Sequence, residues 1–286
     1  AKRNLGVGQG TLVGGLALPV DSAGDLYRTG TQVPSGYLVV PHDGVGITAA
    51  EVQQIITNGI NEANKTRAQI RTPNSETTRM VFAVTDTTGA VLGLYRMPDA
   101  TVFSIDVAVA KARNTAYYND PAQLQAVDKL PELPAGTSLT NRTFRYLAVP
   151  RYPISIQEGA PAPFSMLNDP NIDATTGLQN GARLVPAAYT SIVGYDSFNV
   201  GTNFHAPTIL QNQSGIGFFP GSGSVYKNSL VVGGFGVSGD GVDQDDVVTT
   251  GGIKGFDSPD NLRADQFFVR GVRLPFRKDP RNPQRL

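Results

Sequence analysis

Hydrophobic residues recur with helical spacing near residue 50 of the chain. The positions that define this spacing are Val52, Ile55, Ile56 and Ile60. Residues three, four and eight positions apart share one face of an α-helix. Thr48 and Glu51 precede the hydrophobic positions with the spacing of a capping box. The pattern predicts a helix over about residues 48–68.

Two runs rich in β-branched and aromatic residues follow, at 80–86 and 91–97. The short link between them contains Gly89, an arrangement typical of a β-hairpin. Ser104 is of a residue type that caps helices, and Asp106 complements the dipole of a helix that starts there. We therefore predict a hairpin followed by a helix with Ser104 as its N-cap.

From about residue 119 to residue 225 the periodicity disappears into Pro, Gly, Asn and Ser with scattered aromatic residues. A structureless loop of this length is unusual in a compact domain, so the segment is predicted to be an insertion that packs or wraps a partner. Aromatic side chains order such a segment by being buried, and we favour burial against a neighbouring subunit. The aromatic residues are Phe144, Tyr146, Tyr152, Phe164, Phe204, Phe218 and Phe219.

Regular patterns return after the insertion, with a strand predicted at 229–237, a helix at about 243–250 and a strand at 266–269. Residues 1–46 predict an extended arm with a short strand at 37–40, and residues 274–286 predict a second, Pro- and Arg-rich arm. The order of helix, hairpin, helix, insertion, strand and helix predicts an α+β fold with a mainly antiparallel sheet.

Composition narrows the function. Lys plus Arg and Asp plus Glu both number 24, so no net basic charge attracts phosphates, and a nucleic-acid function is disfavoured. The chain has no Cys, which excludes disulfides, thiolate metal sites, covalent c-type haem and a cysteine nucleophile. No apolar run approaches the ~18 residues of a membrane span, so we expect no membrane insertion. The start at Ala1 rather than Met favours removal of a leader peptide, and hence export to the periplasm or the extracellular space. A chain shortened at this end is the alternative explanation.

The segments together resemble the GlcG/HbpS haem-binding-like family, which includes the C-terminal domain of PduO-type proteins. The resemblance rests on residues 84–86, 89 and 92 of the hairpin, on 96–100 after it and on 104–113 of the following helix. Its second half is 226–239, then Asp245, Asp246 and 255–259. The insertion and residues 262–274 are similar to longer exported members.

The resemblance implies a profilin-like antiparallel sheet flanked by helices, homo-oligomers, and members that bind or degrade haem or act as extracellular redox sensors. We divide the chain into an N-terminal arm at 1–46, a single domain at 47–274 with the insertion at about 120–225, and a C-terminal arm at 275–286.

Haem bound without Cys needs an axial donor from His, Met or Tyr. The chain has two histidines, and we favour His42 as the haem and metal ligand, with Asp43 holding one ring nitrogen while the other binds iron. The alternative for His42 is that it is a solvated loop residue that binds no ligand. His205, Met80, Met97, Met166 and several Tyr are the other donors in the sequence.

The two propionates of haem need cations, and the candidates are Arg96, Lys111 and Arg113. The alternative is that Lys111 and Arg113 face solvent and pair with Asp106 or Asp99.

Other conspicuous residues favour structural interpretations. Asp86 to Gly89 is typical of a hairpin turn, and the glycines at 233, 234, 236 and 239 are typical of close strand packing. The acidic residues at 240, 243, 245 and 246 lack an EF-hand pattern and suit the start of a helix better than a Ca²⁺ site. No ordered catalytic set is present.

The sequence thus favours an exported haem-binding or haem-handling homo-oligomer that acts by non-covalent binding rather than by turnover. A subunit of an extracellular or periplasmic assembly that uses the fold without a ligand is the first alternative. An enzyme acting on haem or a corrinoid is the second, and the least favoured.

Overall fold

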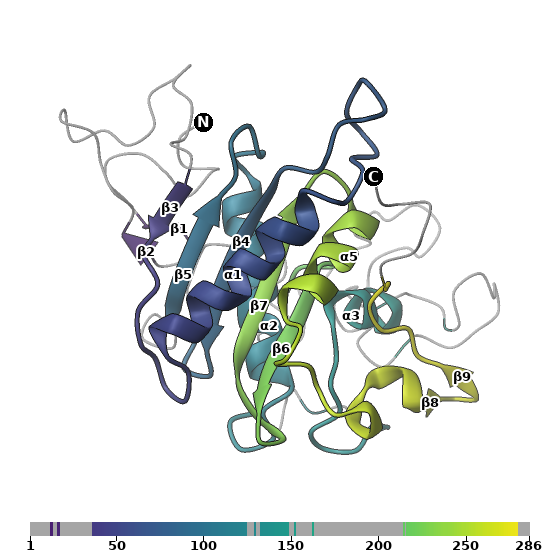
Figure 1. The fold of residues 1–286 in the computed structure, drawn as a ribbon. Helices are drawn as coiled ribbons and strands as arrows, with labels where there is room; N and C mark the ends of the chain where they lie inside the picture. Colours follow the sequence, from purple (N-terminus) through teal and green to yellow (C-terminus); the bar gives the residue numbers. More distant parts are fainter. Residues whose placement is uncertain are drawn as a thin grey trace, which may run out of the picture.

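The computed structural model describes residues 12–13, 16–17, 36–124, 129, 132–148, 152, 162, 214 and 216–279. Its centre is a five-stranded antiparallel sheet of order β3-β5-β4-β7-β6 (Figure 1). The strands are β3 Gly36–Val39, β4 Met80–Asp86, β5 Val91–Arg96, β6 Ser222–Lys227 and β7 Leu230–Gly239. Together with the helices that flank the sheet, this architecture confirms the predicted α+β class.

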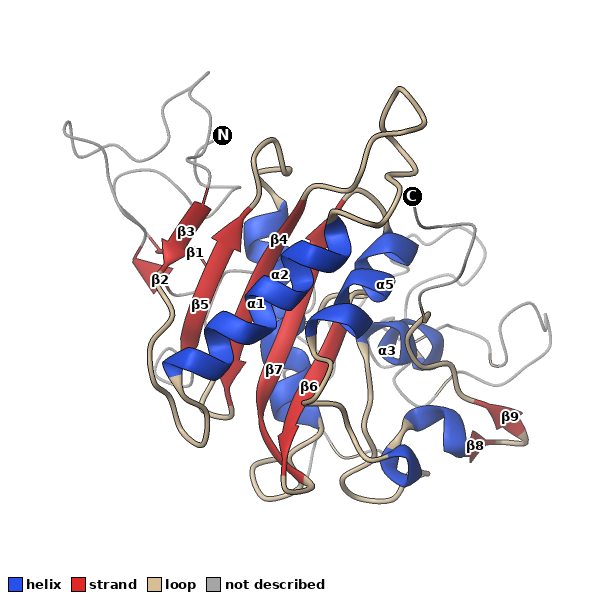
Figure 2. Ribbon diagram, in the orientation of Figure 1, coloured by secondary structure: helices blue, strands red, loops and turns tan. Residues whose placement is uncertain are grey.

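Helices cover both faces of the sheet. In Figure 2, α1 (Ala49–Ala63) and α5 (Val242–Gly252) lie in front of the strands and α2 (Ser104–Tyr118) lies behind them. A Cβ placed on Gly93 of β5 meets Val52 of α1, whereas a Cβ on Gly236 of β7 meets the backbone of Ala108 in α2. The opposite neighbours of these glycines confirm that the three helices divide between the two faces.

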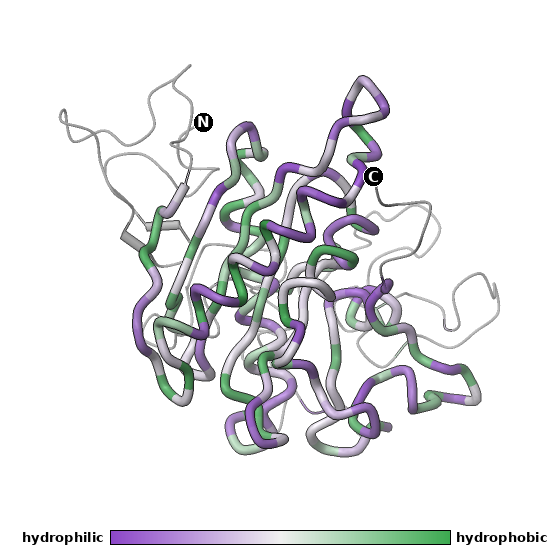
Figure 3. The backbone as a smooth tube through the Cα atoms, in the orientation of Figure 1, coloured by the Kyte–Doolittle hydropathy of each residue, from purple (hydrophilic) through white to green (hydrophobic). Residues whose placement is uncertain are grey.

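The main core lies between the sheet and the helices. All seven residues of β4 are buried, as expected for a central strand covered on both faces. Phe82 of β4 and Phe235 of β7 stack with ring centroids 6.2 Å apart beneath α1 and α5. Figure 3 shows the same distribution, with hydrophobic positions concentrated in the central strands and hydrophilic ones in the outlying loops.

The capping box at the start of α1 is confirmed. The Glu51 backbone N–H donates to the Thr48 hydroxyl, and the Thr48 backbone N–H donates to the Glu51 carboxylate at 2.8 Å. The helix ends at Ala63 and not near residue 68, because the Thr66 hydroxyl donates to the Glu62 carbonyl at 2.9 Å and the chain turns there.

The prediction of Ser104 as the N-cap of α2 is wrong. Phe103 occupies that position, and the Ser104 hydroxyl contacts Thr101 at 2.5 Å and Ser238 at 3.2 Å. Nearly all of α2 is buried, because residues 132–148, 216–220 and 262–276 lie over the side that faces away from the sheet. The helix is therefore internal on both sides.

A second hydrophobic cluster fills this outer layer. It contains Phe144 of the short helix α3 (Asn141–Leu147), Tyr152, Leu274 and Phe276. The expectation that the aromatics of the insertion pack on a neighbouring subunit is wrong for Phe144 and Tyr152, which are buried within the chain's own fold. Phe164 and Phe204 lie outside the described residues.

The sequence patterns missed two elements of the outer layer and sheet. Helix α3 begins with a capping box between Thr140 and Thr143, and β6 forms the sheet edge although four of its six residues are Ser, Gly or Lys. The predicted strand at 266–269 is reduced to β8 (Phe268–Val269), which pairs with β9 (Val272–Arg273). Residues 260–262 and 264–266 form 3₁₀ turns, and β1 (Leu12–Val13) pairs with β2 (Leu16–Ala17).

The C-terminal segment packs on the body as far as it is described. Leu274 and Phe276 are buried, and the Thr143 hydroxyl donates to the Pro275 carbonyl at 2.8 Å. The Lys278 backbone N–H donates to Asp246 at 3.1 Å. Residues up to 279 therefore belong to the folded unit.

Candidate functional site

Lys111, a predicted propionate partner, lies inside the protein. Its ammonium nitrogen donates to Asp245 Oδ2 at 2.9 Å and to the Val237 carbonyl at 2.7 Å, and its side chain is 0% exposed. The solvent-facing alternative is wrong for Lys111, and so is pairing with Asp106 or Asp99, because the partner comes from α5.

Burial dominates the chemistry of Asp245. Loss of water raises the pKa of Asp245 to about 6, even though the Lys111 ammonium opposes the shift. Asp246 beside it is also buried, and burial raises its pKa as well, against the effect of Arg142. The interior between α2, α5 and β6 therefore holds carboxyl groups that take up protons more readily than surface ones.

Asp246 and Asp243 bind the C-terminal segment and α3. Arg142 of α3 pairs with both carboxylates, and the Lys278 side chain donates to Asp243 at 2.7 Å. The Gly221 backbone N–H donates to Asp246 Oδ1 at 2.7 Å, and a Cβ at Gly221 would collide with Asp245. Asp243, Asp245 and Asp246 lie near the start of α5, as the helix-start interpretation predicted, and they form ion pairs with Arg142 and Lys111. Asp240 precedes α5 and pairs with Arg71.

Arg113 and Arg96 are also engaged internally. Arg113 Nε donates to the Gly89 carbonyl at 2.9 Å and its Nη1 donates to Ser214 at 2.9 Å, with no exposed surface left. Burial lowers the pKa of Arg113 to about 10. The Arg96 guanidinium donates to the Ala100 carbonyl. In this conformation Lys111 and Arg113 are covered by protein, so their contact with propionates stays a prediction that requires new partners.

His42 differs from the three cations because it is exposed, on the loop between β3 and α1. Its Nδ1 lies 3.0 Å from the Val40 carbonyl. A carbonyl only accepts, so Nδ1 carries the proton, and in the neutral ring Nε2 keeps its lone pair. Asp43, predicted to hold the ring, instead accepts from the Ala49 backbone N–H at 2.7 Å and helps to cap α1.

The His42 loop is tied to the rigid hairpin. The His42 backbone N–H donates to the Leu92 carbonyl at 3.0 Å, and the Val45 N–H donates to Asp86 Oδ2 at 3.1 Å. Asp86 also accepts from the Thr88 backbone at 2.9 Å, and Gly89 has a φ of +82°, so the predicted hairpin-turn role is confirmed. The imidazole thus projects from a fixed stretch of backbone.

A cation that was not predicted from the sequence lies at the end of β6, close to the start of α1. Lys227, at the end of β6, pairs at 2.8 Å with Glu51 in the first turn of α1. The His42 loop approaches β7, since a Cβ on Gly46 would contact Val232. No local spacing links position 227 to position 42, and only the β6–β7 pairing brings that strand end to the start of α1.

The glycines of β7 serve packing, as their structural interpretation predicted. A Cβ on Gly234 would lie 1.9 Å from the Ala112 carbonyl oxygen, and one on Gly236 would lie 2.0 Å from that of Ala108. Side chains at these positions are excluded because α2 lies directly on the strand.

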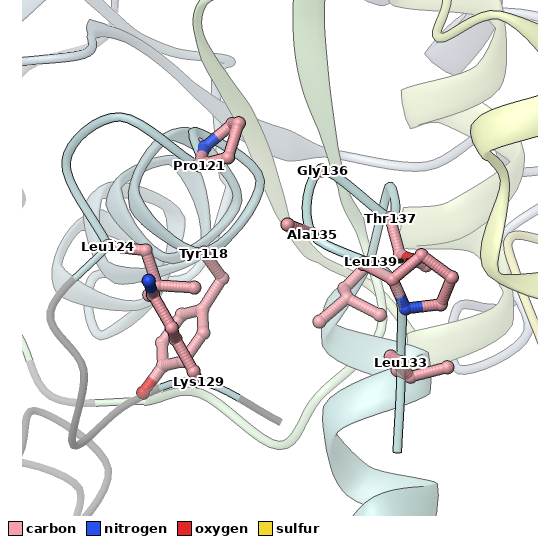
Figure 4. A pocket seen from close by; sticks show the side chains of 10 residues that line it. Tyr118, Pro121, Leu124, Lys129, Leu133, Ala135, Gly136, Thr137 and Leu139 are labelled. Atoms are coloured by element: carbon pink, nitrogen blue, oxygen red, sulfur yellow. Dashed lines mark hydrogen bonds between the residues drawn. The ribbon is translucent and has the colours of Figure 1, made fainter. Parts of the chain in front are cut away.

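Two hollows were not predicted from the sequence. One, of about 250 Å³, lies at the end of α2, where Tyr118, Leu124 and Lys129 face Leu133 and Leu139 across a gap (Figure 4). The other is an open polar groove of about 800 Å³ between α1 and α5. Its lining residues are Gln54, Asn58, Asn61, Glu62, Lys65, Thr250, Gly251, Lys254, Gly255 and Asp257.

Within the described ranges, no group of three or more His, Cys, Asp or Glu side chains could hold a metal ion. Among the same residues, no helix is long and apolar enough to cross a bilayer.

Comparisons with known proteins give likenesses of structure at low identity. No family model matches the chain. No curated protein matches it either. Three solved structures are similar to it. Klebsiella pneumoniae ORFY, described by the family model DUF336, has 17% identity and a TM-score of 0.38 over 80% of this chain and 97% of its own.

The PduOC:heme complex has 18% identity and a TM-score of 0.37, covering 73% of this chain and 94% of its own. A double mutant of Streptomyces reticuli HbpS has 13% identity and a TM-score of 0.37, covering 74% and 88%. PduOC and HbpS bear the names of the group that the sequence resembles. At these identities and TM-scores, no ligand, activity or assembly carries over to this chain.

Proposed function

We propose that this chain is a non-covalent haem-binding protein in which His42 supplies the axial donor. The observation that carries the proposal is the hydrogen bond from His42 Nδ1 to the Val40 carbonyl, at 3.0 Å, on an exposed loop. Histidines that bind metals are oriented in this way, with one ring nitrogen bonded to a carbonyl or carboxylate and the other directed at the metal. Nε2 of His42 has no hydrogen-bond partner among the described residues.

The surface beside His42 suits a flat apolar ligand. Val40 is 70% exposed and Val45 is 59% exposed, so two aliphatic side chains close to His42 in the sequence lack cover from the described residues. Covering them with a porphyrin face removes apolar surface from water, which is favourable at about 25 cal/mol per Å². Lys227, which pairs with Glu51 in the first turn of α1, is the cation that we propose for a propionate.

When bound, haem supplies its own iron chemistry, and the residues here orient and hold it. The chain has no Cys, so no thioether attachment forms and the ligand remains exchangeable. The proposal extends to this chain the ligand that the PduOC description names, but its support is the geometry of His42. Export to the periplasm or the extracellular space and assembly into a homo-oligomer belong to the same proposal.

The test is a titration with haemin followed by absorption. Wild type is expected to give a Soret band that saturates at one haem per chain. His42→Ala is expected to weaken binding at least tenfold, while His205→Ala, at the other histidine of the chain, binds as wild type does. Equal binding by wild type and His42→Ala would sink the assignment of His42.

The remaining cations separate two modes of propionate binding. Lys227→Gln is expected to weaken haemin binding several-fold without moving the Soret band, because an ion pair at the rim contributes affinity and not iron ligation. Arg96, Lys111 or Arg113 could bind propionates only by exchanging their internal partners. In that case, substituting the residue reduces the free energy of haemin binding by more than it reduces the free energy of unfolding of the ligand-free protein.

A second candidate function is that of an assembly subunit. The β8–β9 hairpin lies away from the main sheet in Figure 2, and Phe268 on it is 62% exposed. A large aromatic side chain on a projecting hairpin is typical of a contact with another subunit. Haemin titration and light scattering of the intact protein together distinguish the functions, since a scaffold forms its oligomer but gives no saturable Soret band.

A further inference from the structure

The hollow at the C-terminal end of α2 has the features of a preformed ligand site. Its walls are mainly apolar, with Tyr118, Leu124, Leu133 and Leu139 around a volume of about 250 Å³. Figure 4 shows Tyr118 and Leu124 on one side and Leu133 and Leu139 on the other, with Lys129 beside the tyrosine ring. Apolar walls with one charged group at the rim are the usual composition of small-molecule sites.

Hydrogen bonds hold the two walls apart. The Asn119 side chain donates from Nδ2 to the Leu139 carbonyl and accepts at Oδ1 from the Leu139 N–H, both at 2.8 Å. The next residue back, Ser138, donates its backbone N–H to the Leu262 carbonyl at 2.7 Å and accepts from the Ala264 N–H at 3.0 Å. The far wall is therefore fixed both to α2 and to the segment near residue 263.

The remaining parts of the lining are also anchored. The Thr137 hydroxyl and backbone N–H both donate to the Pro134 carbonyl, at 2.7 and 3.2 Å, which closes a turn. The Tyr118 ring packs against Phe144 with centroids 4.9 Å apart. A cavity with walls held this way does not close by small shifts of side chains.

Charge selects the ligand. Lys129 is exposed at the rim and has no ion-pair partner among the described residues. Asp128, the neighbour of Lys129 in the sequence, lies outside the described residues. Two other nearby carboxylates are occupied: Asp120 accepts from the Ala122 backbone N–H at 2.9 Å, and Glu132 pairs with Arg270 at 2.7 Å. Among the described residues that line the cavity, Lys129 carries the one formal charge, which is positive.

We propose that this cavity binds a small organic anion with an apolar body, such as a medium-chain carboxylate, with the tail between the leucines and the charged end at Lys129. The volume is below the roughly 300–1,000 Å³ of drug-sized sites, which fits one acyl chain or one to two rings. A whole tetrapyrrole exceeds it. The site is thus separate from the haem site proposed at His42. The failure of one proposal leaves the other standing.

The probe is octanoate, with 1-octanol as the uncharged molecule of the same chain length. Calorimetry on the full-length protein is expected to show saturable binding of one octanoate per chain and weaker binding of octanol. In wild type, amide NMR signals of Gly136 and Thr137 are expected to shift with octanoate in the same concentration range. Absence of saturable octanoate binding, or shifts confined to other residues, overturns the proposal.

Substitutions then assign the two halves of the ligand. Lys129→Gln is expected to weaken the binding of octanoate up to about fivefold, which is the range of an exposed ion pair, and to leave the binding of octanol unchanged. Leu133→Asn is expected to weaken the binding of both octanoate and octanol. Lys65→Gln and Leu230→Asn are the matched controls, at an exposed lysine and an exposed leucine outside the cavity. Equal octanoate affinity in Lys129→Gln, Leu133→Asn and the controls contradicts the site.

Discussion

Lys111 Nζ lies 2.9 Å from Asp245 Oδ2, and this contact joins helices on opposite faces of the sheet. Lys111 belongs to α2, whereas Asp245 belongs to α5, which lies on the other face with α1. The connection passes where β6 begins, and Gly221 leaves room for it because a Cβ there would lie 3.0 Å from Lys111 Nζ. Lys111, which was predicted to bind a propionate, instead forms an ion pair that connects the helices on the two faces of the sheet.

Removing one member of this pair is expected to be costly. Lys111→Met leaves a buried carboxylate without its cation, which lowers the free energy of unfolding by about 3–5 kcal/mol. Adding Asp245→Asn to that variant is expected to recover part of the loss. Lys227→Met, in the half-exposed pair with Glu51, is the control and costs below about 1 kcal/mol. Urea denaturation measures all three, and equal losses for the two lysines contradict a buried pair.

The same carboxyl gives a pH dependence of defined sign. Burial raises the pKa of Asp245 to about 6 from an ordinary 3.8, so the folded state binds this proton more tightly than the unfolded state does. The Asp245 contribution to stability therefore increases as pH falls from 7 to 5, by about 1 kcal/mol.

The measurement is the difference in unfolding free energy between wild type and Asp245→Asn at pH 7 and at pH 5. Titration of the surface groups cancels in this difference. The account predicts that wild type gains on the variant as pH falls, and a difference that is constant or moves the other way refutes the raised pKa.

Because α2 packs closely on β7, adding one methyl group to a glycine of β7 is expected to lower the stability of the protein strongly. Gly236→Ala places a Cβ 2.0 Å from the Ala108 carbonyl oxygen, so helix and strand must separate, and we expect a loss of about 1–3 kcal/mol or more from overpacking. Gly255→Ala is the comparison, with open space around the Cβ but a φ of +91°, and costs about 1–2 kcal/mol. Thermal unfolding ranks them, and a milder effect at Gly236 contradicts the close contact.

The β8–β9 hairpin provides a prediction about assembly. If Phe268 contacts another subunit, Phe268→Ser lowers the oligomer mass measured by light scattering, because the exposed ring supplies apolar contact area. Leu230→Ser, at another exposed apolar residue, serves as the control. An unchanged mass for Phe268→Ser removes the hairpin from the interface.

Local signals in the sequence were sufficient for the central fold. Periodicity and a capping box place α1, two runs rich in β-branched and aromatic residues place β4 and β5, and the hydrophobic run after the insertion places β7. These elements can be predicted from local sequence because their own residues favour the structure that they adopt. Strand β6 lacked such a signal, since its backbone pairing with β7 and not its composition makes it a strand.

The candidate site was less predictable than the fold. His42 was found because histidine is rare in this chain, but its orienting partner is the backbone of Val40, which no residue identity reveals. Lys111 and Arg113 are buried, and their hydrogen-bond partners include Val237, Asp245 and Ser214 from distant parts of the chain. Burial set by residues more than a hundred positions away leaves no local pattern.

The most direct test of the proposed function is the absorption spectrum of haemin bound to His42→Gly with and without added imidazole. Removing the side chain takes away the donor, and free imidazole restores the same nitrogen ligand. The account predicts that the Soret band of wild type is lost or shifted in His42→Gly and returns when imidazole is added. A His42→Gly spectrum identical to that of wild type before imidazole is added would contradict ligation by His42.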